Sequence, residues 1–255
     1  MVAQELKSAG FKVYAAARRV DRMADLEKDG ITPVALDLTR DGSIAACVNT
    51  ILSKEKSIDV LVNNAGYGSY GAIEDVPLEE GRRQFEVNLF GIARLIRLVT
   101  PAMREQHYEK IVNISSMGGK IWTKFGGWYH ATKYAVEGLS DCLRMELQPF
   151  GIDVVVVKPG GIKTDRGLIA AENLKKTSTN GAYAEMANKA ADGMIKNYSV
   201  DLLSKPALIA KTVRKAVTKR RPRTRYLVGF GAKPMVWTHR LFGDRVFDWV
   251  LRTFS

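Results

Sequence analysis

The sequence is poor in cysteine and in long apolar runs, and each shortage excludes a class of protein. Cys47 and Cys142 are its two cysteines. Both stand in segments of helical periodicity, so we expect buried thiols in a reducing, cytoplasmic compartment rather than a disulfide framework. No run approaches the roughly 20 apolar residues of a membrane-spanning helix. The opening MVAQELKSAG lacks the apolar stretch of a secretion signal.

Internal repeats and low-complexity linkers are lacking as well. Of the 255 residues, 46% are hydrophobic. That share is enough to fill the core of one large domain, which we expect to span residues 1–255.

Acidic residues are scarce relative to basic ones. Asp and Glu number 27 against 39 Lys and Arg, and the net charge of +12 suits anionic partners such as a phosphorylated cofactor or acidic lipid headgroups. The excess is densest in KTVRKAVTKRRPRTR, from Lys211 to Arg225. This stretch has no interleaved aromatic residues, so we expect no nucleic-acid partner and favour a solvated helix face followed by a turn.

Short β-branched runs alternate with longer helical patterns along the chain. Strands are predicted at Lys12–Arg18, Thr32–Leu38, Ile58–Ala65, Lys110–Ser116, Asp153–Gly160 and Arg225–Phe230. Helices are predicted between them, for example at Glu79–Arg104 and Trp128–Pro149. Apolar strands separated by helices indicate a parallel sheet covered on both faces. The predicted fold class is therefore α/β, with a doubly wound, Rossmann-like parallel sheet.

The chain opens with a helical pattern where a sheet of this class normally opens with a strand. Val2, Leu6 and Phe11 follow helical spacing, and Gly10 supplies a stop signal. The first strand of the fold, and the phosphate-binding loop that should follow it, are therefore lacking from the pattern.

A G-x-G-x-x-G spacing, from Gly66 to Gly71 in NNAGYGSYG, does not replace that loop. A dinucleotide-binding loop leads directly into a helix whose N-terminal N–H groups face the pyrophosphate. Here the next helix is predicted to start near Pro77 or Leu78. We therefore interpret the spacing as a coincidence. The stretch is a strand that ends in Asn-Asn-Ala-Gly at the edge of the sheet where ligands bind.

Two later stretches carry residues suited to acid–base chemistry. VNISS brings Ser115 and Ser116 to the carboxyl edge of the sheet, and YHATK places Tyr129 and Lys133 on one helix face. A phenol with a pKa of about 10 is a poor catalyst at neutral pH, and a nearby ammonium group lowers that pKa. A hydroxyl group from Ser116 can hold a carbonyl oxygen beside the phenol. Together these groups can give a proton to a carbonyl while another group gives hydride.

In their order and spacing these motifs resemble the short-chain dehydrogenase/reductase family over essentially the whole chain. NNAG, FEVNLFG, VNISS, YHATK and VKPGGIKT carry the resemblance. It implies that Tyr129 is the general acid/base, that Lys133 lowers its pKa and binds the nicotinamide ribose, and that Ser116 orients the substrate carbonyl. It also implies that Asn88 holds a water molecule in a proton relay behind Lys133.

The same resemblance implies a nicotinamide dinucleotide cofactor. Its implied contacts are Asp37 on the adenine amino group, Asn64, Ala65 and Gly66 on the adenosine side, Tyr129, Lys133, and Pro159, Gly160, Ile162 and Thr164 around the nicotinamide and phosphates. The strand at Lys12–Arg18 ends in Arg18 and Arg19 with no acid at its tip. Paired guanidinium groups suit a 2′-phosphate, so we expect NADP(H) in preference to NAD(H). No metal site is predicted.

The sequence departs from the family at its beginning. The family starts with a strand and a Thr-Gly-x-x-x-Gly-x-Gly loop, and this strand lies between the equivalents of Lys12–Arg18 and Ile58–Ala65. Its loss leaves two unpaired edges in the core, at about 1–3 kcal/mol for each orphaned polar group. We therefore expect a truncated form of a longer protein that binds NADP(H) weakly and folds poorly unless the two neighbouring strands pair directly.

The last third of the chain carries the expected substrate region. Residues 166–200 stand where the family has a variable lid, and Met186, Ala190 and Met194 there form a helical stripe of the kind that is more often core than pocket. Residues 231–255 are amphipathic, and three interpretations stay open: a helix docked on the core or on a homo-oligomer partner, a wall of the substrate pocket, or a peripheral membrane helix. This region resembles retinol and hydroxysteroid dehydrogenase-like members, which implies a bulky apolar alcohol or ketone.

Two functions from different classes follow. The first is an NADP(H)-dependent oxidoreductase that interconverts a hydrophobic ketone or aldehyde and its alcohol by hydride transfer, and the intact Ser116, Tyr129 and Lys133 favour it. The alternative is a non-catalytic binding or scaffold protein, or an inactive fragment, and the lacking phosphate-binding loop favours that.

Overall fold

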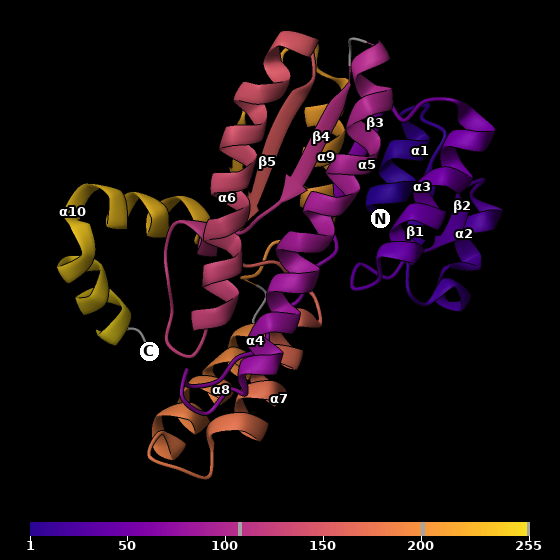
Figure 1. Ribbon diagram of the computed structural model, residues 1–255. Helices are drawn as coiled ribbons and strands as arrows, with labels where there is room; N and C mark the ends of the chain where they lie inside the picture. Colours follow the sequence, from indigo (N-terminus) through magenta and orange to yellow (C-terminus); the bar gives the residue numbers. More distant parts are fainter. Residues whose placement is uncertain (107–108, 200–201, 254–255) are drawn as a thin grey trace.

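The computed structural model describes residues 1–106, 109–199 and 202–253 (Figure 1). All six predicted strands are confirmed, each within its predicted bounds. They are β1 (Tyr14–Ala17), β2 (Thr32–Ala35), β3 (Val60–Asn63), β4 (Lys110–Ile114), β5 (Asp153–Pro159) and β6 (Arg225–Val228). The valine and isoleucine runs that signalled them pack well on a pleated, buried surface.

Helices separate the strands as expected. They are α1 (Val2–Ser8), α2 (Asp25–Lys28), α3 (Asp41–Glu55), α4 (Leu78–Phe85), α5 (Gly91–Gln106), α6 (Gly127–Leu147), α7 (Arg166–Ser178), α8 (Ala184–Ser199), α9 (Ala207–Thr218) and α10 (Ala232–Thr253). The short turns are η1 (Val20–Met23), η2 (Glu86–Phe90), η3 (Met117–Gly119) and η4 (Gln148–Phe150). The helix predicted at Glu79–Arg104 is α4 and α5 joined by η2, a single π-helical turn.

The strands form parallel sheets, which confirms the α/β class. β3, β4, β5 and β6 make one four-stranded sheet in that order, and β1 and β2 make a separate two-stranded sheet. In the larger sheet Val60 lies opposite Lys110, and Lys110 lies opposite Asp153. The division into two sheets differs from the single sheet that the fold class predicts.

Apolar cores lie on both faces of the larger sheet. Alternate residues of a strand point to opposite faces, so Ile111 of β4 packs with α3, α5 and α6, whereas its neighbour Val112 packs with α1 and α9. Figure 1 shows α6 on one side of β4 and β5 and α9 on the other. The basic residues of α9 lie on its exposed face, for example Lys211 and Lys215, as the solvated-face interpretation expects.

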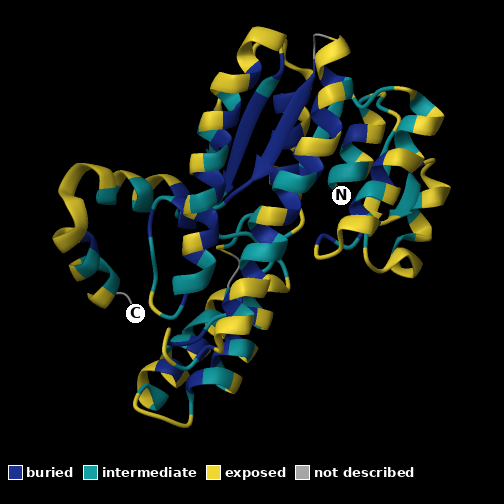
Figure 2. Cartoon of the chain, viewed as in Figure 1, coloured by how far each residue is buried: buried dark blue, intermediate teal, exposed yellow. Residues whose placement is uncertain are grey.

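A cavity separates the two sheets. β1 pairs with β2 and β3 pairs with β4, and an apolar cavity of about 560 Å³ lies between β1 and β3. β1 and β3 therefore do not pair with each other. Direct pairing of these two strands was the arrangement expected to allow stable folding without an intervening strand. Every residue of β4 is buried, whereas Val60 to Val62 of β3 are half-buried and Ala16 of β1 is exposed (Figure 2).

The predicted lid is the α7–α8 hairpin, whose last predicted residue, 200, lies outside the described residues. Its buried stripe is Ala187 and Ala191 with Ala171 and Leu174 of α7, and Ala190 and Met194 pack partly against it. Met186 is 48% exposed, so the predicted stripe is wrong at that residue. The buried position is that of its neighbour Ala187. The expectation of two buried thiols is also wrong for Cys142, which is exposed, whereas Cys47 is buried.

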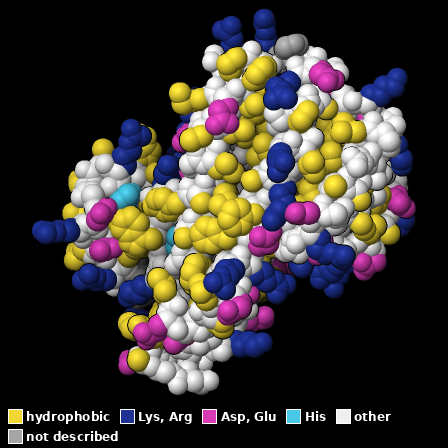
Figure 3. Space-filling view, viewed as in Figure 1, with side chains coloured by type: hydrophobic (Ala, Val, Ile, Leu, Met, Phe, Trp, Pro, Cys, Tyr) yellow, Lys and Arg dark blue, Asp and Glu magenta, His cyan; other side chains and the backbone are white. Residues whose placement is uncertain are grey.

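The C-terminal helix α10 is kinked at Gly243, whose φ is 73°. It docks on the chain through the fully buried Phe247, which stacks edge-on against Trp122, and through Asp248, which accepts a 2.9 Å hydrogen bond from the Trp122 indole. Large apolar side chains of α10 stay exposed. Figure 3 shows hydrophobic side chains gathered between α10 and the rest of the molecule. Within the described residues, no helix is both long and apolar enough to cross a bilayer.

Candidate active site

The predicted catalytic residues meet where β4 ends. Ser116 follows β4 and caps the η3 turn, because its hydroxyl oxygen accepts a 3.0 Å hydrogen bond from the N–H of Gly118. Tyr129 and Lys133 lie in the first turns of α6, and the Tyr129 phenol is within hydrogen-bonding reach of Ser116. The sequence therefore placed these three side chains together correctly.

Lys133 is held in the interior of the site. Its side chain is 2% exposed, and Nζ donates a 3.0 Å hydrogen bond to the backbone carbonyl of Ile114. Nζ lies 5.9 Å from the centre of the Tyr129 ring. The bond to Ile114 uses one of the three ammonium hydrogens, so two remain for other acceptors.

The electrostatics of the pair differ from the predicted lowering of the Tyr129 pKa by Lys133. Burial raises the pKa of Tyr129 above its ordinary value, and the Ser116 hydrogen bond and the charge of Arg166 oppose that rise. Burial and Arg166 lower the pKa of Lys133 to about 7, while Glu137 opposes them. Because Lys133 is only about half-charged at neutral pH, it gives the phenolate little support in this state of the protein.

Asn88 sits in the π-helical turn between α4 and α5 and is fully buried. Its side-chain oxygen accepts a 3.0 Å hydrogen bond from the N–H of Tyr67, and its amide donates to the carbonyl of Tyr67 at 2.8 Å and to Thr132 at 3.1 Å. The side chain therefore ties the loop after β3 to the start of α6. Both amide hydrogens are used, so the predicted water relay would need another group of this residue, and it stays a prediction.

The loop after β3 passes directly over the catalytic side chains. A Cβ on Gly66 would lie 3.0 Å from the side-chain oxygen of Asn88 and 3.6 Å from Nζ of Lys133. A Cβ on Gly68 would lie 3.0 Å from the ring of Tyr129. Gly66 was predicted on the adenosine side, whereas here it adjoins Lys133. The glycines do not lead into a helix, because α4 begins only at Leu78, as predicted; two of them nevertheless pass close to the catalytic side chains.

Tyr70 and Arg166 were not predicted as site residues. The rings of Tyr70 and Tyr129 are tilted against each other with their centres 5.9 Å apart, and Tyr70 packs on the apolar core of the α7–α8 hairpin. Arg166 opens α7, and its charge lowers the pKa of both Tyr129 and Lys133. The sequence does place Arg166 at the start of the predicted lid. A single basic residue at such a position is typical of solvated surface, so the pattern alone does not indicate a role in the site.

The segment from Pro159 to Thr164 runs past Ser116. The Ser116 hydroxyl lies 3.5 Å from the carbonyl of Pro159. The N–H of Gly160 bonds the carbonyl of Val228 at 2.8 Å, and a Cβ on Gly160 would lie 2.4 Å from the carbonyl of Phe230. Ile162 packs in the core beneath, and Thr164 is half-buried. This close contact with the end of β6 holds the segment beside the catalytic residues.

The remaining predicted cofactor residues lie across the cavity. Arg18 and Arg19 are exposed after β1, and Asp37 follows β2, where its carboxylate accepts bonds from the N–H and hydroxyl of Thr39 at 3.0 and 2.7 Å. These bonds, with the charges of Arg18 and Arg40, lower the pKa of Asp37.

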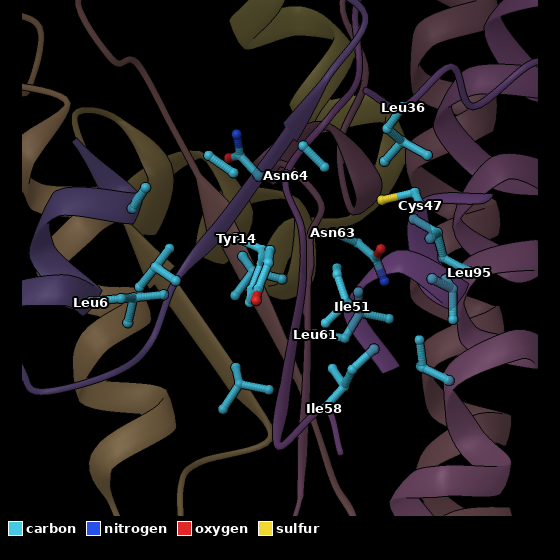
Figure 4. Close-up of a pocket in the computed structure, with 18 of the residues that line it drawn as sticks. Leu6, Tyr14, Leu36, Cys47, Ile51, Ile58, Leu61, Asn63, Asn64 and Leu95 are labelled. Atoms are coloured by element: carbon cyan, nitrogen blue, oxygen red, sulfur yellow. The ribbon is translucent and has the colours of Figure 1, made fainter. Parts of the chain in front are cut away.

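Arg18 also lines a polar cavity of about 600 Å³ with Arg83 and Lys176. Asn64 and Ala65 border the apolar cavity on the β3 side (Figure 4). The predicted site residues thus form two groups, one on each side of the cavity.

The residues fit a nicotinamide dinucleotide at its two ends. Lys133 can donate hydrogen bonds to ribose hydroxyls, and Ser116 and Tyr129 can hold a carbonyl oxygen. Arg18, Arg83 and Lys176 give positive charge for a phosphate, although Asp75 and Glu80 line the same cavity. For the pyrophosphate between these ends, the described chain shows no glycine-rich turn that leads straight into a long helix.

Comparisons with known proteins identify the family of the chain. Residues 1–174 match the family model described as short chain dehydrogenase. The chain is 32% identical over 251 residues to VdlC of Helicobacter pylori, named a probable short-chain type dehydrogenase/reductase, with 97% of this chain and 90% of that protein covered.

A solved short-chain dehydrogenase from Streptomyces avermitilis is 33% identical, with a TM-score of 0.81 over 94% of this chain and 87% of that one. A solved actinorhodin polyketide ketoreductase with NADPH is 28% identical, with a TM-score of 0.70 over 84% and 83%.

The comparisons correct two finer expectations. Near-complete coverage of the relatives does not bear out the expected truncation. None of these three relatives is named for retinoids or steroids, so that subgroup gains no support from them. The family model matches more than half of the sequence, and the relatives cover nearly all of it. This chain is therefore an enzyme of the short-chain dehydrogenase/reductase family.

Proposed function

We propose that this enzyme interconverts a bulky apolar ketone or aldehyde and the corresponding alcohol, with NADP(H) as its hydride carrier. The observation that carries the proposal is the meeting of Ser116, Tyr129 and Lys133 at the end of β4. When bound, the nicotinamide supplies or accepts the hydride. The protein's own groups then have to orient the carbonyl and move one proton.

Each side chain has a role that its surroundings allow. Ser116 donates a hydrogen bond to the carbonyl oxygen and keeps it beside the phenol. The pKa of Tyr129 is raised by burial, so its hydroxyl group is protonated at neutral pH and acts as the acid during reduction. Lys133, with a pKa of about 7, can return a proton to the phenol, and it would also hold the ribose hydroxyls of the cofactor.

The apolar surroundings support a bulky substrate. Tyr70 lies against Tyr129 and joins the apolar core of the α7–α8 hairpin, to which Phe125 also belongs. A carbonyl held at Ser116 would therefore have its apolar portion next to aromatic side chains. The ketoreductase among the relatives is named for a ketone reaction, which agrees with this substrate class.

Tyr129→Phe tests the proposal. We expect kcat for ketone reduction to fall at least about 100-fold, because the proton donor is removed, while the Kd of NADPH stays within about threefold. The matched control is Tyr134→Phe, which removes a hydroxyl group from a 40% exposed tyrosine on the same helix and should leave kcat unchanged. Equal turnover in wild type and Tyr129→Phe would remove this residue from the mechanism.

The preference for NADP(H) depends on Arg18 and Arg19. A double change of both to alanine should weaken NADP(H) binding about 10- to 100-fold, because a hydrogen bond to a charged group contributes about 1.5–3 kcal/mol. NAD(H) lacks the 2′-phosphate, so its Kd should stay the same. Calorimetric titration with both cofactors checks this, and equal losses for the two would contradict the assignment.

The alternative, a non-catalytic binding protein, is not supported, because the chain belongs to a family of enzymes. The cavity that separates Arg18 from the catalytic residues bears on cofactor affinity instead. The two unpaired cysteines support a reducing, cytoplasmic setting for the proposed reaction.

The exposed apolar side chains of α10 support contact with another surface. Leu241 and Phe242 are 66% and 63% exposed, and Arg240 and Arg245 flank them. A homo-oligomer partner or an acidic membrane could cover them. Co-sedimentation with phosphatidylserine vesicles, lost in a Leu241→Asp, Phe242→Asp double variant, would select the membrane, and a concentration-dependent dimer lost in the same variant would select the oligomer.

A further inference from the structure

His130 follows Tyr129 directly in α6, and its imidazole is held at both ring nitrogens. The residue is 7% exposed. Nδ1 lies 2.9 Å from the backbone carbonyl of Gly118, and Nε2 accepts a 3.0 Å hydrogen bond from the N–H of Thr123. The ring therefore joins the η3 turn after β4 to the segment that leads into α6.

These two partners fix the protonation of the ring. A carbonyl oxygen can only accept a hydrogen bond, so Nδ1 must carry the hydrogen that binds Gly118. A backbone N–H can only donate, so Nε2 must present its lone pair to Thr123. The neutral Nδ1–H tautomer satisfies both bonds, whereas a charged ring would set one N–H against another. Burial lowers the pKa of His130 and favours the neutral form, although the bond to Gly118 opposes this.

The imidazole fits closely between two glycines. A Cβ on Gly118 would lie 2.8 Å from Nδ1, and a Cβ on Gly126 would lie 2.7 Å from Nε2. Both distances are shorter than a side chain at either position could keep without displacing the ring. The backbone on both sides of His130 therefore follows the outline of the ring and leaves it little freedom to turn.

The bond at Nε2 anchors a segment that lies next to a strained residue. Phe125, two residues after Thr123, has a φ of 64°, in the left-handed region that residues with a Cβ rarely adopt. Its carbonyl accepts a 2.9 Å hydrogen bond from the N–H of Gly71, and its ring packs on the core of the α7–α8 hairpin. The Thr123 side chain also hydrogen-bonds the phenol of Tyr70. The ring of His130 thus holds the segment that carries these contacts.

Gly118 carries the constraint from His130 to Ser116. Its N–H donates the 3.0 Å hydrogen bond to Oγ of Ser116, while its carbonyl is the group that His130 holds. Glycine has the most freely rotating backbone of all residues, so the bond from the imidazole restricts both adjoining peptide units. Because Gly118 occupies one lone pair of the hydroxyl oxygen, the hydroxyl hydrogen must point elsewhere. The carbonyl of Pro159, at 3.5 Å, is too distant to compete strongly with a substrate carbonyl for that hydrogen.

We propose that His130 is a positioning residue for the reaction, because through Gly118 it orients the Ser116 hydroxyl toward the substrate carbonyl. This inference rests on the proposed function, since it requires Ser116 to hold that carbonyl. Both nitrogens of the ring are engaged by backbone groups. His130 therefore supplies geometry and transfers no proton.

Asparagine and glutamine separate the two ends of the imidazole. The amide nitrogen of asparagine stands where Nδ1 stood and can still donate to Gly118, whereas the amide of glutamine stands where Nε2 stood and can serve only the bond to Thr123. With NADPH and a bulky apolar ketone, we expect His130→Gln to lower kcat about 10- to 30-fold, because a misplaced positioning group costs up to about 100-fold. His130→Asn should restore kcat to within about threefold of wild type. A larger loss in His130→Asn than in His130→Gln would overturn the proposal.

A double-mutant cycle with Ser116→Ala shows whether the effect passes through Ser116. Residues that act as one unit have non-additive effects. In the Ser116→Ala background, His130→Gln should change kcat less than about threefold. Equal losses in both backgrounds would mean that His130 only supports the fold, and would overturn this proposal alone. An unchanged kcat in Ser116→Ala itself would overturn the proposed function together with it.

The nitrogen chemical shifts of isotope-labelled histidine test the arrangement without an activity assay. The signals of His130 are those that are lost from the spectra of both His130 variants. In wild type at pH 8, where an ordinary histidine is neutral, we expect Nδ1 to be protonated and Nε2 to be unprotonated. A ring with its hydrogen on Nε2 could not donate to the carbonyl of Gly118 through Nδ1, and this result would overturn the proposal whether or not the variants fold.

Discussion

Lys133 should cost the folded protein stability, and this cost should depend on pH. Its pKa is lowered from 10.5 to about 7 in the folded chain, chiefly by burial. Between these two values the unfolded chain binds more protons than the folded chain, so the free energy of unfolding rises with pH. Each pKa unit corresponds to about 1.36 kcal/mol. The lysine therefore destabilises the fold by about 4 kcal/mol at pH 7 and about 2 kcal/mol at pH 9.

Lys133→Met removes this titration. The variant should lose the hydrogen bond to Ile114 at a cost of about 1–3 kcal/mol that does not vary with pH. Wild type should gain about 2 kcal/mol more than the variant between pH 7 and pH 9. Urea unfolding at pH 7, 8 and 9 measures this, and the double difference cancels every other titrating group. The window stops below the pKa of Tyr129, which burial raises above 10.

Lys211→Met is the control, because Lys211 is an exposed lysine on α9 and its loss should leave the pH dependence of wild type intact. Parallel curves for wild type and Lys133→Met would refute the reasoning. Lys133 would then be charged at neutral pH, and its support of the Tyr129 phenolate would have to be stronger than the structure indicates.

Three further predictions concern the surroundings of the site. Glu137→Ala leaves the buried Lys158 without its counter-charge and should lower the free energy of unfolding by about 3 kcal/mol. Asp141→Ala removes a more exposed carboxylate and should lower it by about 1 kcal/mol or less in the same urea titration. Gly66→Ala should lower kcat about 10- to 100-fold in a steady-state assay, because its Cβ would lie 3.0 Å from the Asn88 oxygen and must displace the loop. Wild type should bind NADPH with a Kd above the micromolar range, since the two ends of the site lie on separate sheets; calorimetry that finds micromolar or tighter binding would contradict this.

Much of the fold could be predicted because its signals are local. The β-branched runs around β4 and β5 are apolar throughout, and burial on both faces is the physical cause of that pattern. The meeting of Ser116, Tyr129 and Lys133 was also predictable, because strand ends of a parallel sheet share one edge and helix residues four apart share one face.

Other features depend on tertiary packing and left no local signal. The π-helical turn at Asn88 has an ordinary helical sequence, and its position is set by the hydrogen bonds to Tyr67 and Thr132. The direction of the Tyr129 pKa shift depends on how deeply the phenol and Lys133 are buried, which spacing along a helix does not reveal. The cavity between β1 and β3 likewise became visible only when the pairing of each strand was known.

The central claim is that Tyr129 protonates a carbonyl while the cofactor reduces it, and isotope transfer tests this most directly. Wild type and Tyr129→Phe would be incubated with millimolar NADPH carrying deuterium on the transferable C4 position and a bulky apolar ketone, and the alcohol analysed by mass spectrometry. The account predicts deuterium on the carbinol carbon of the wild-type product and almost no product from the variant. An alcohol without deuterium, or equal deuterated product from both proteins, would contradict it.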